Sequence, residues 1–247
     1  MTRRPDILII QTGTAPEDLR ASHGDLASWF CYALQRPVDT VDVVKVFEGA
    51  LLPPPGAHRA AIITGSWSMV TDRHAWSEAT AQWIREALAL DMPLLGICYG
   101  HQLMAHATGG RVGYHPRGLE VGCQSIELLP AAAADPLLRS LPRRFDAHLT
   151  HLQTILELPP GATALARSSH DPHQIVRYGP RALSTQFHPE STPDISTACI
   201  MRRAETLLGE GKNPSELLDD VRETPHAAEL LRRFVRAFSD EATHYTT

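Results

Sequence analysis

A cysteine flanked by glycines is the residue of this chain best suited to covalent chemistry. It lies in the run Gly96-Ile97-Cys98-Tyr99-Gly100, which is followed directly by His101-Gln102. The apolar residues before it predict a buried strand, and residues 102–107 predict the first turns of a helix. A Gly-x-nucleophile-x-Gly run between a strand and a helix is typical of a nucleophile elbow, whose central residue takes a strained, positive φ. The helix N-terminus would then favour the Cys98 thiolate.

A cysteine nucleophile also needs a base, a group that orients the base, and donors for an oxyanion. A buried structural cysteine is the alternative, but flanking glycines and a polar His-Gln pair fit that interpretation poorly. The run Gln186-Phe187-His188-Pro189-Glu190 offers the base, because His188 closes an apolar strand. Glu190 follows two residues later, and its carboxylate can reach the other ring nitrogen and hold the tautomer.

Two backbone groups are candidates for the oxyanion donors. The N–H of Tyr99 directly follows the nucleophile. The second candidate is Gly65, which follows the short apolar run Ala60-Ala61-Ile62-Ile63 and lets the backbone approach a substrate closely. Losing one such donor typically lowers a rate by ~10²–10³.

Composition and charge restrict the classes of partner. The chain has 247 residues, of which 43% are hydrophobic and 21% charged, a profile typical of a soluble globular protein. A formal net charge of -5 argues against a nucleic-acid surface. The apolar run Ile7-Leu8-Ile9-Ile10 is too short for a signal-peptide core, and no run approaches the length of a membrane span. We therefore expect a cytoplasmic protein with no nucleic acid and no membrane among its partners.

The cysteines and histidines do not follow a metal-binding pattern. The cysteines at positions 31, 98, 123 and 199 have neither paired spacing nor zinc spacing, so we expect free thiols. His148 and His151, and likewise His170 and His173, are separated by two residues. No cysteine or carboxylate completes a compact ligand set around them in the sequence. We expect neither a metal nor a cofactor.

The first half of the chain predicts an open α/β sheet. Trp76, Ala79, Trp83 and Ala87 recur at intervals of three and four, which is typical of a helix that lies between apolar strand-like runs. Alternation of strands and helices is typical of open α/β sheets. The expected strands cover residues 6–10, 40–47 and 60–63 and the apolar run 93–95 before the elbow, and the first expected helix covers residues 17–34.

After Gly110 the pattern changes to one dominated by strands, which we expect to be mixed or antiparallel and laid against the same core. These strands cover residues 118–128, 143–151, 163–168, 174–178 and 182–187. Beyond residue 193 the chain is expected to be helical. The run Asn213-Pro214-Ser215-Glu216 is a well-formed helix start, and an apolar stripe follows at residues 227, 231, 234 and 238. That stripe should cover the domain; docking of a partner is the alternative.

The two motifs together resemble those of class I, triad-type glutamine amidotransferases. The similarity is closest to the stand-alone members that are similar to the amidotransferase domain of GMP synthase, and it runs from about Asp6 to Glu190. It implies a flavodoxin-like open α/β sheet, mostly parallel, with helices on both faces, extra mixed or antiparallel strands and a helical C-terminal extension. Residues 1–193 would form the amidotransferase domain, and residues 194–247 would form the extension, packed on that same domain.

The resemblance also implies a role for each residue of the motifs. Cys98 would be the nucleophile, His188 the base and Glu190 the group that orients it. Gly65 and Tyr99 would supply the oxyanion hole through their backbone N–H groups. The family often has Pro-Gly-Gly where this chain has Thr64-Gly65-Ser66, so the role of the first glycine is the one that carries over.

Substrate binding is implied for four further residues. Gln102, four residues after the nucleophile, would bind the α-amino acid end of the substrate, with Ser66 beside it. His151 and Leu152 belong to Thr150-His151-Leu152-Gln153, which loosely resembles the substrate-side strand end of the family.

The reaction implied is hydrolysis of the γ-amide of glutamine, or of a γ-glutamyl compound, through a γ-glutamyl thioester. We expect the ammonia to reach an acceptor on a separate synthetase subunit, because the residues after Glu190 are too few for an acceptor domain. A stand-alone γ-glutamyl peptidase or hydrolase is the second interpretation, and a non-catalytic binding module is the third. An α/β-hydrolase of the dienelactone hydrolase kind is a fourth, although its acid residue normally precedes the histidine.

Overall fold

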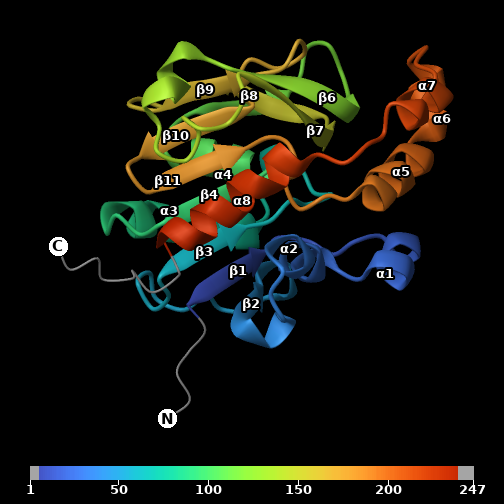
Figure 1. Ribbon diagram of the computed structural model, residues 1–247. Coiled ribbons are helices and arrows are strands. Elements are labelled where there is room, and N and C mark those ends of the chain that lie inside the picture. The colour runs from blue at the N-terminus through green and yellow to red at the C-terminus, as the bar shows by residue number, and fades with distance from the viewer. Residues whose placement is uncertain (1–5, 239–247) are drawn as a thin grey trace.

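A nine-stranded mixed sheet forms the centre of the molecule, which the computed structural model describes over residues 6–238 (Figure 1). A separate two-stranded sheet lies beside it. The strands are β1 (Ile7–Gln11), β2 (Val41–Lys45), β3 (Ala60–Ile63), β4 (Leu94–Ile97), β5 (Arg111–Tyr114), β6 (Glu120–Leu128), β7 (Arg144–His151), β8 (Gln153–Glu157), β9 (Thr163–Arg167), β10 (Ile175–Gly179) and β11 (Ala182–Thr185). The helices are α1 (Glu17–His23), α2 (Leu26–Leu34), α3 (Ala75–Ala89), α4 (Tyr99–Ala107), α5 (Pro193–Arg202), α6 (Ala204–Gly209), α7 (Pro214–Asp219) and α8 (Pro225–Phe238).

The order of the strands divides the large sheet into a parallel and an antiparallel part. It runs β2-β1-β3-β4-β11-β10-β9-β6-β7. Neighbours from β2 to β11 pair in parallel, and neighbours from β11 to β7 pair antiparallel. The parallel part has the strand order of a flavodoxin-like sheet, with β11 as its fifth strand. The expected fold class is confirmed.

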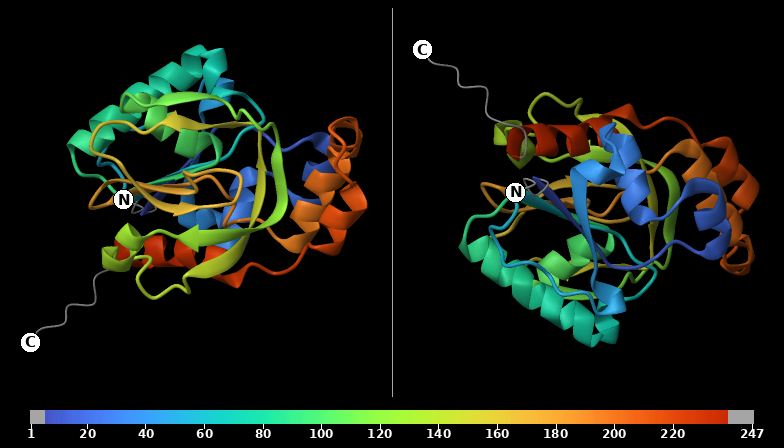
Figure 2. Two further views of the ribbon diagram at one scale, coloured as in Figure 1. Left: turned by 90° about the horizontal axis from the view of Figure 1, so that it is seen from above. Right: turned by 90° about the horizontal axis from the view of Figure 1, so that it is seen from below.

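Alternation along the central strands explains why helices cover both faces. In β1, Ile7 and Ile9 pack into the core on one side, whereas Leu8 and Ile10 pack into a second core on the other. The first core includes residues of α2 and α8, and the second includes residues of α3 and α4. Figure 2 shows α3 and α8 on opposite faces of the sheet. The strands are therefore apolar on both sides, as a covered parallel sheet requires.

The antiparallel part curls back towards the parallel part. β7 is the edge strand of the sheet, yet the backbone oxygen of His148 in β7 accepts a hydrogen bond from the backbone N–H of His188, at 2.9 Å. His188 follows β11, which lies near the middle of the sheet. The end of β7 therefore comes to the same edge as the ends of β4 and β11.

The C-terminal helices pack on the same body as the sheet. α5 contacts α1, α7 and β6, and α8 contacts α2 and β7. The helix start predicted at Asn213 is confirmed, because its side chain accepts a hydrogen bond from the N–H of Ser215 at the start of α7. Leu231 and Phe234 of α8 are fully buried, so the predicted stripe covers the domain. Phe238 packs against the same core.

Two details of the predicted elements are wrong. The helix expected over residues 17–34 is two helices, because Gly24 takes a φ of 76° and ends α1. The carboxylate of Asp25 then caps α2 by accepting the N–H of Leu26. The short pair β5 and β8 was not predicted at all, since neither run alternates clearly in polarity.

Among the described residues, no helix combines the length and the apolar character that a membrane crossing needs.

Candidate active site

The ends of three neighbouring parallel strands bring the predicted site residues together. β4 lies between β3 and β11, so the residues that follow these strands meet at one edge of the sheet. Those residues are Gly65, Cys98 and His188. A Cβ atom on Gly65 would lie 3.0 Å from Cε1 of His188 and 3.7 Å from Cβ of Cys98. The absence of a side chain at Gly65 therefore leaves room directly beside the other two.

The turn at Cys98 has the geometry predicted for an elbow. Cys98 has a φ of 51°, in the left-handed region, and caps the N-terminus of α4. Its N–H donates to the backbone oxygen of Thr185 at 2.8 Å, which ties the turn to β11. A Cβ on Gly100 would lie 2.9 Å from Cβ of Ile63, and one on Gly96 would lie 2.6 Å from the backbone oxygen of Gly100. Both glycines are therefore required for strand and helix to pass so closely.

His188 and Glu190 form a buried hydrogen-bonded pair. Nδ1 of His188 lies 2.8 Å from Oε1 of Glu190, whose side chain is only 2% exposed. The intervening proline thus leaves the carboxylate within reach of the ring, as expected. Nε2 of His188 has no partner among the described residues, and His188 lines the same pocket as Cys98. The ring therefore has one nitrogen held by Glu190 and the other free for Cys98 or a substrate.

The charges around the elbow favour a thiolate–imidazolium pair. Burial alone would raise the pKa of Cys98, but the charge on His188, with a contribution from His151, brings that pKa below its usual value. Burial alone would lower the pKa of His188, but the charges on Glu190 and Cys98 hold that pKa well above its usual value. Both shifts favour the state in which the sulfur is anionic and the ring is protonated.

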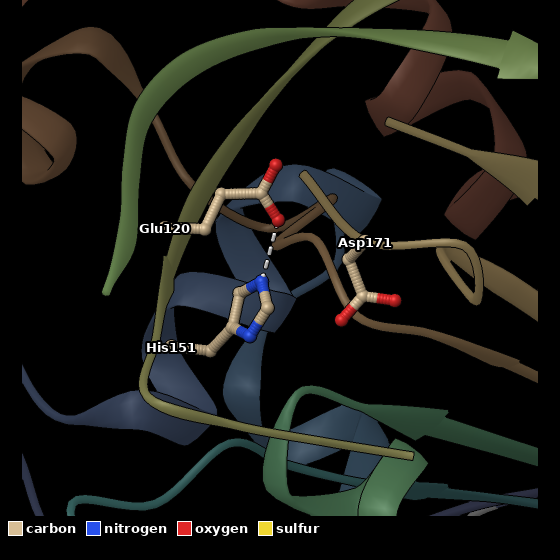
Figure 3. A group of neighbouring side chains, drawn as sticks. All are labelled: Glu120, His151 and Asp171. Carbon is tan, nitrogen blue, oxygen red and sulfur yellow. Dashed lines mark hydrogen bonds and ion pairs between the residues drawn. The ribbon is translucent and has the colours of Figure 1, made fainter. Parts of the chain in front are cut away.

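A second buried ion pair lies beside the first. Nε2 of His151 is 2.7 Å from Oε2 of Glu120, and both side chains are almost completely buried (Figure 3). Nδ1 of His151 faces a backbone oxygen, that of Gln153, at 2.9 Å. Both ring nitrogens therefore face acceptors, which favours the doubly protonated ring. Burial alone would lower the pKa of His151, but Glu120 outweighs it and raises that pKa.

The ligand-type atoms of Glu120, His151 and Asp171 all lie within 4.8 Å of one another, a spacing that could hold a cation (Figure 3). Their atoms already have protein partners. The carboxylate of Glu120 accepts from Ser168 at 2.5 Å and from Gln174 at 2.8 Å, besides its contact with His151. The carboxylate of Asp171 accepts from the hydroxyl of Thr154 and from a backbone N–H. This cluster is better described as a hydrogen-bonded network than as a metal centre.

Tyr99 contributes its backbone to the elbow and its side chain to the core. Its N–H belongs to the first turn of α4, where helix N–H groups have no partner within the helix. Its phenol hydroxyl lies 2.6 Å from the hydroxyl of Ser77, and its ring stacks on Trp76. Burial raises the pKa of Tyr99 to about 12, so the phenol stays neutral. The side chain thus anchors α4 against α3.

The residues expected to bind substrate line one polar pocket next to Cys98. Gln102, Ser66, His151 and Leu152 all belong to its wall. The amide nitrogen of Gln102 donates to the backbone oxygen of Gln153 at 2.6 Å and to a second side chain, so its carbonyl oxygen is the atom left for a ligand. The hydroxyl of Ser66 donates to a backbone oxygen. His151 is committed to the ion pair described above.

Several wall residues were missed by reasoning from the sequence. Trp29, Trp67, His148, Ile195 and Arg203 line a pocket that contains Cys98, and Trp67 and Arg203 line the polar pocket as well. Ile195 and Arg203 belong to the C-terminal helical segment, for which the sequence indicated a covering role or docking of a partner and no part in the site. None of these residues lies in a recognisable motif. Trp29 and Ile195 reach the pocket because α2 and α5 pack together, which no local pattern reports.

Comparison with known proteins identifies one family. A sequence model described as glutamine amidotransferase class-I matches residues 50–204. A GMP synthase (glutamine-hydrolyzing) subunit from Thermococcus kodakarensis is 36% identical over 121 residues, which cover 49% of this chain and 62% of that one. γ-Glutamyl peptidase 5 of Arabidopsis thaliana is 29% identical over 174 residues, which cover 70% of this chain and 68% of that one.

The fold is shared with solved structures. A glutamine amidotransferase from Thermotoga maritima superposes with a TM-score of 0.74 at 22% identity, covering 95% of this chain and 98% of that one. The relatives named GMP synthase are longer than the region they share with this chain. The matched region spans only 19% to 30% of three further proteins of that name.

Proposed function

The chain belongs to the class I glutamine amidotransferases, and we propose that it hydrolyses the γ-amide of glutamine or of a γ-glutamyl compound through a thioester on Cys98. The observation that carries the proposal is the elbow. Cys98 has a φ of 51° at a helix N-terminus, beside a histidine that is hydrogen-bonded to a buried carboxylate. A thiolate, a base and an orienting group at one strand edge are the parts of an acyl-transfer site.

In the first step, the Cys98 thiolate attacks the γ-carbonyl carbon and forms a carbon–sulfur bond. The negative charge that develops on the carbonyl oxygen is received by the N–H groups of Gly65 and Tyr99. The carbon–nitrogen bond then breaks, and Nε2 of His188 gives its proton to the leaving nitrogen. Glu190 holds the ring in place through its 2.8 Å contact with Nδ1 and stabilises the protonated form.

In the second step, water hydrolyses the thioester. His188, now neutral, takes a proton from the water as the oxygen attacks the carbonyl carbon. The same two N–H groups receive the oxyanion again. The carbon–sulfur bond breaks, the product acid leaves, and the thiolate and the protonated His188 are restored. No group is consumed over the cycle except the amide and one water.

Two fates of the nitrogen are compatible with this chemistry. Ammonia delivery to a synthetase partner in trans is supported by the relative that is named as one subunit of a GMP synthase. Stand-alone hydrolysis is the second candidate, and a specific observation favours it. The side of the site next to His188 is closed by Trp29 and Ile195, which belong to the chain's own α2 and α5. The wall at which the nitrogen leaves is therefore built without a partner.

The direct experiment measures the release of ammonia and glutamate from glutamine by the purified chain. We expect turnover by the wild type, none above background by Cys98→Ala, and full turnover by the matched control Cys123→Ala, which changes a buried cysteine away from the site. Equal activity in Cys98→Ala would refute the proposal. Silence of the wild type towards glutamine and γ-glutamyl peptides, with no alkylation of Cys98, would favour a non-catalytic binding module.

A further inference from the structure

Cys98 lies between two pockets of different character. One is the polar pocket that contains Gln102 and residues 150–153, which run from the end of β7 to the start of β8. The other, which we call the apolar pocket, has Leu26, Trp29, Trp67, Ile195 and Cys199 in its wall, together with polar residues such as Ser191 and Ser196. Trp67 also lines the polar pocket. A γ-glutamyl substrate with its reacting carbon at Cys98 has two ends, one for each pocket.

The position of His188 decides which end lies in which pocket. His188 and Glu190 line the apolar pocket and not the polar one. Since the general acid must reach the leaving nitrogen, that nitrogen and its substituent extend on the side of His188. The charged α-amino acid end then lies on the other side, in the polar pocket. The apolar pocket is therefore the subsite of the leaving amine.

The apolar residues that form the wall of this subsite are packed against one another. Trp29 is packed in a small core with Leu26 and Ile195, which joins α2 to α5. Trp67 meets Trp29 edge to face, with ring centroids 6.4 Å apart, and stays 37% exposed. Ammonia is small and polar and gains nothing from two indole rings and an aliphatic wall. An amine that carries an apolar group gains roughly fourfold in binding for each methylene buried there.

A buried imidazole also lines this wall. His148 lines the apolar pocket and is 2% exposed. Burial and the neighbouring charge on His188 lower the pKa of His148 to about 4, against an opposing effect of the Arg222 backbone. A neutral imidazole offers one donor and one acceptor. Near neutral pH, His148 therefore adds no charge to the wall of the subsite.

We propose that the apolar pocket binds the leaving amine of the substrate, and that the chain acts on γ-glutamyl amides whose amine carries an apolar or aromatic group. The inference rests on the proposed function and names the substrate class of the same site. The amine can come from an amino acid, as in a γ-glutamyl dipeptide, or from a simple amine. Arg203, which lines both pockets, would meet the carboxylate in the first case.

The experiment compares kcat/KM for L-glutamine, γ-glutamylglycine, γ-glutamylphenylalanine and γ-glutamyl phenethylamide. γ-Glutamylglycine has the same secondary amide as the phenylalanine compound but lacks the side chain. We expect kcat/KM for at least one phenyl substrate to exceed that for γ-glutamylglycine by at least about tenfold, the discrimination that one or more buried methylenes provide. If the natural amine is an amino acid, we expect the higher kcat/KM for γ-glutamylphenylalanine. If it is a simple amine, we expect the higher kcat/KM for γ-glutamyl phenethylamide.

Two variants test whether the preference arises in the apolar pocket. Trp67→Ala removes a wall residue that is 37% exposed, and Cys199→Phe adds bulk at a wall residue that packs against Trp29 and Ile195. We expect both variants to lower the ratio of kcat/KM for the phenyl substrate to kcat/KM for γ-glutamylglycine by at least about fivefold. Tyr32→Ala is the matched control, because Tyr32 lies on α2 but is 73% exposed and outside both pockets.

The outcomes separate this inference from the proposed function. If glutamine and γ-glutamylglycine are hydrolysed but kcat/KM for the phenyl substrates is about equal to that for γ-glutamylglycine, the inference is overturned and the proposed function stays intact. A phenyl preference that persists in both variants would also overturn it. Failure of every substrate would overturn the proposed function itself.

Discussion

Replacing Glu190 by glutamine removes one charge from the site and almost no volume. In the wild type, Oε1 of Glu190 lies 2.8 Å from Nδ1 of His188, and the carboxylate is 2% exposed. A buried hydrogen bond to a charged group is worth roughly 1.5–3 kcal/mol, which corresponds to about 10- to 150-fold in rate. A glutamine amide can also donate to Nδ1 and fix the wrong tautomer, an effect that reaches ~10⁴ in a catalytic triad. We therefore expect Glu190→Gln to lower kcat by about 10² to 10⁴.

The assay is steady-state hydrolysis of a γ-glutamyl substrate across pH, with Glu205→Gln as an exposed control. Glu190 raises the pKa of His188 in the wild type, after the opposing effect of burial. Its loss lowers that pKa, so the pH range in which the ring is protonated shortens at its upper end. The alkaline limb of kcat/KM should move to lower pH. A fall in kcat of less than about tenfold, with an unmoved alkaline limb, would refute the reasoning.

Three further outcomes follow from the geometry. Gly100→Ala should destabilise the fold by about 1–3 kcal/mol, because its Cβ would overlap the end of β3; a melting temperature within about 1 °C of wild type would contradict this. Glu120→Gln should cost about 3–5 kcal/mol in urea unfolding, because it leaves His151 as an unpaired buried cation, and partial recovery is expected when His151→Asn is added. Iodoacetamide at pH 7 should label Cys98 faster than Cys199, because the pKa of Cys98 is lowered and burial raises that of Cys199; equal rates would argue against the thiolate.

The elbow and the strand ends could be predicted because their signals are local. Gly96 and Gly100 flank Cys98 in the sequence, and His188 closes an apolar run. Once the chain is taken as an α/β sheet, the carboxyl ends of its parallel strands share an edge, which brings Gly65, Cys98 and His188 together. The structure agrees with each of these expectations, and the catalytic roles of the residues remain to be tested.

The remainder depends on contacts between residues far apart in the chain. Glu120 and His151 lie on neighbouring antiparallel strands, and nothing in either local sequence shows that they face each other. The apolar pocket needs α2 and α5 to meet, so the role of Ile195 could not be read from the tail alone. The break at Gly24 was missed because an apolar period continues across it, although the turn conformation of Gly24 ends the helix.

The central claim is that a γ-glutamyl group is carried on Cys98. The most direct measurement is mass spectrometry of protein that is quenched in acid during turnover of γ-glutamylphenylalanine or glutamine, followed by peptide mapping. We predict a mass increase of one γ-glutamyl group on the peptide that contains Cys98. The increase should be absent from Cys98→Ala and should disappear when the substrate is exhausted. Turnover without any adduct on Cys98, or an adduct on another residue that persists in Cys98→Ala, would contradict the mechanism.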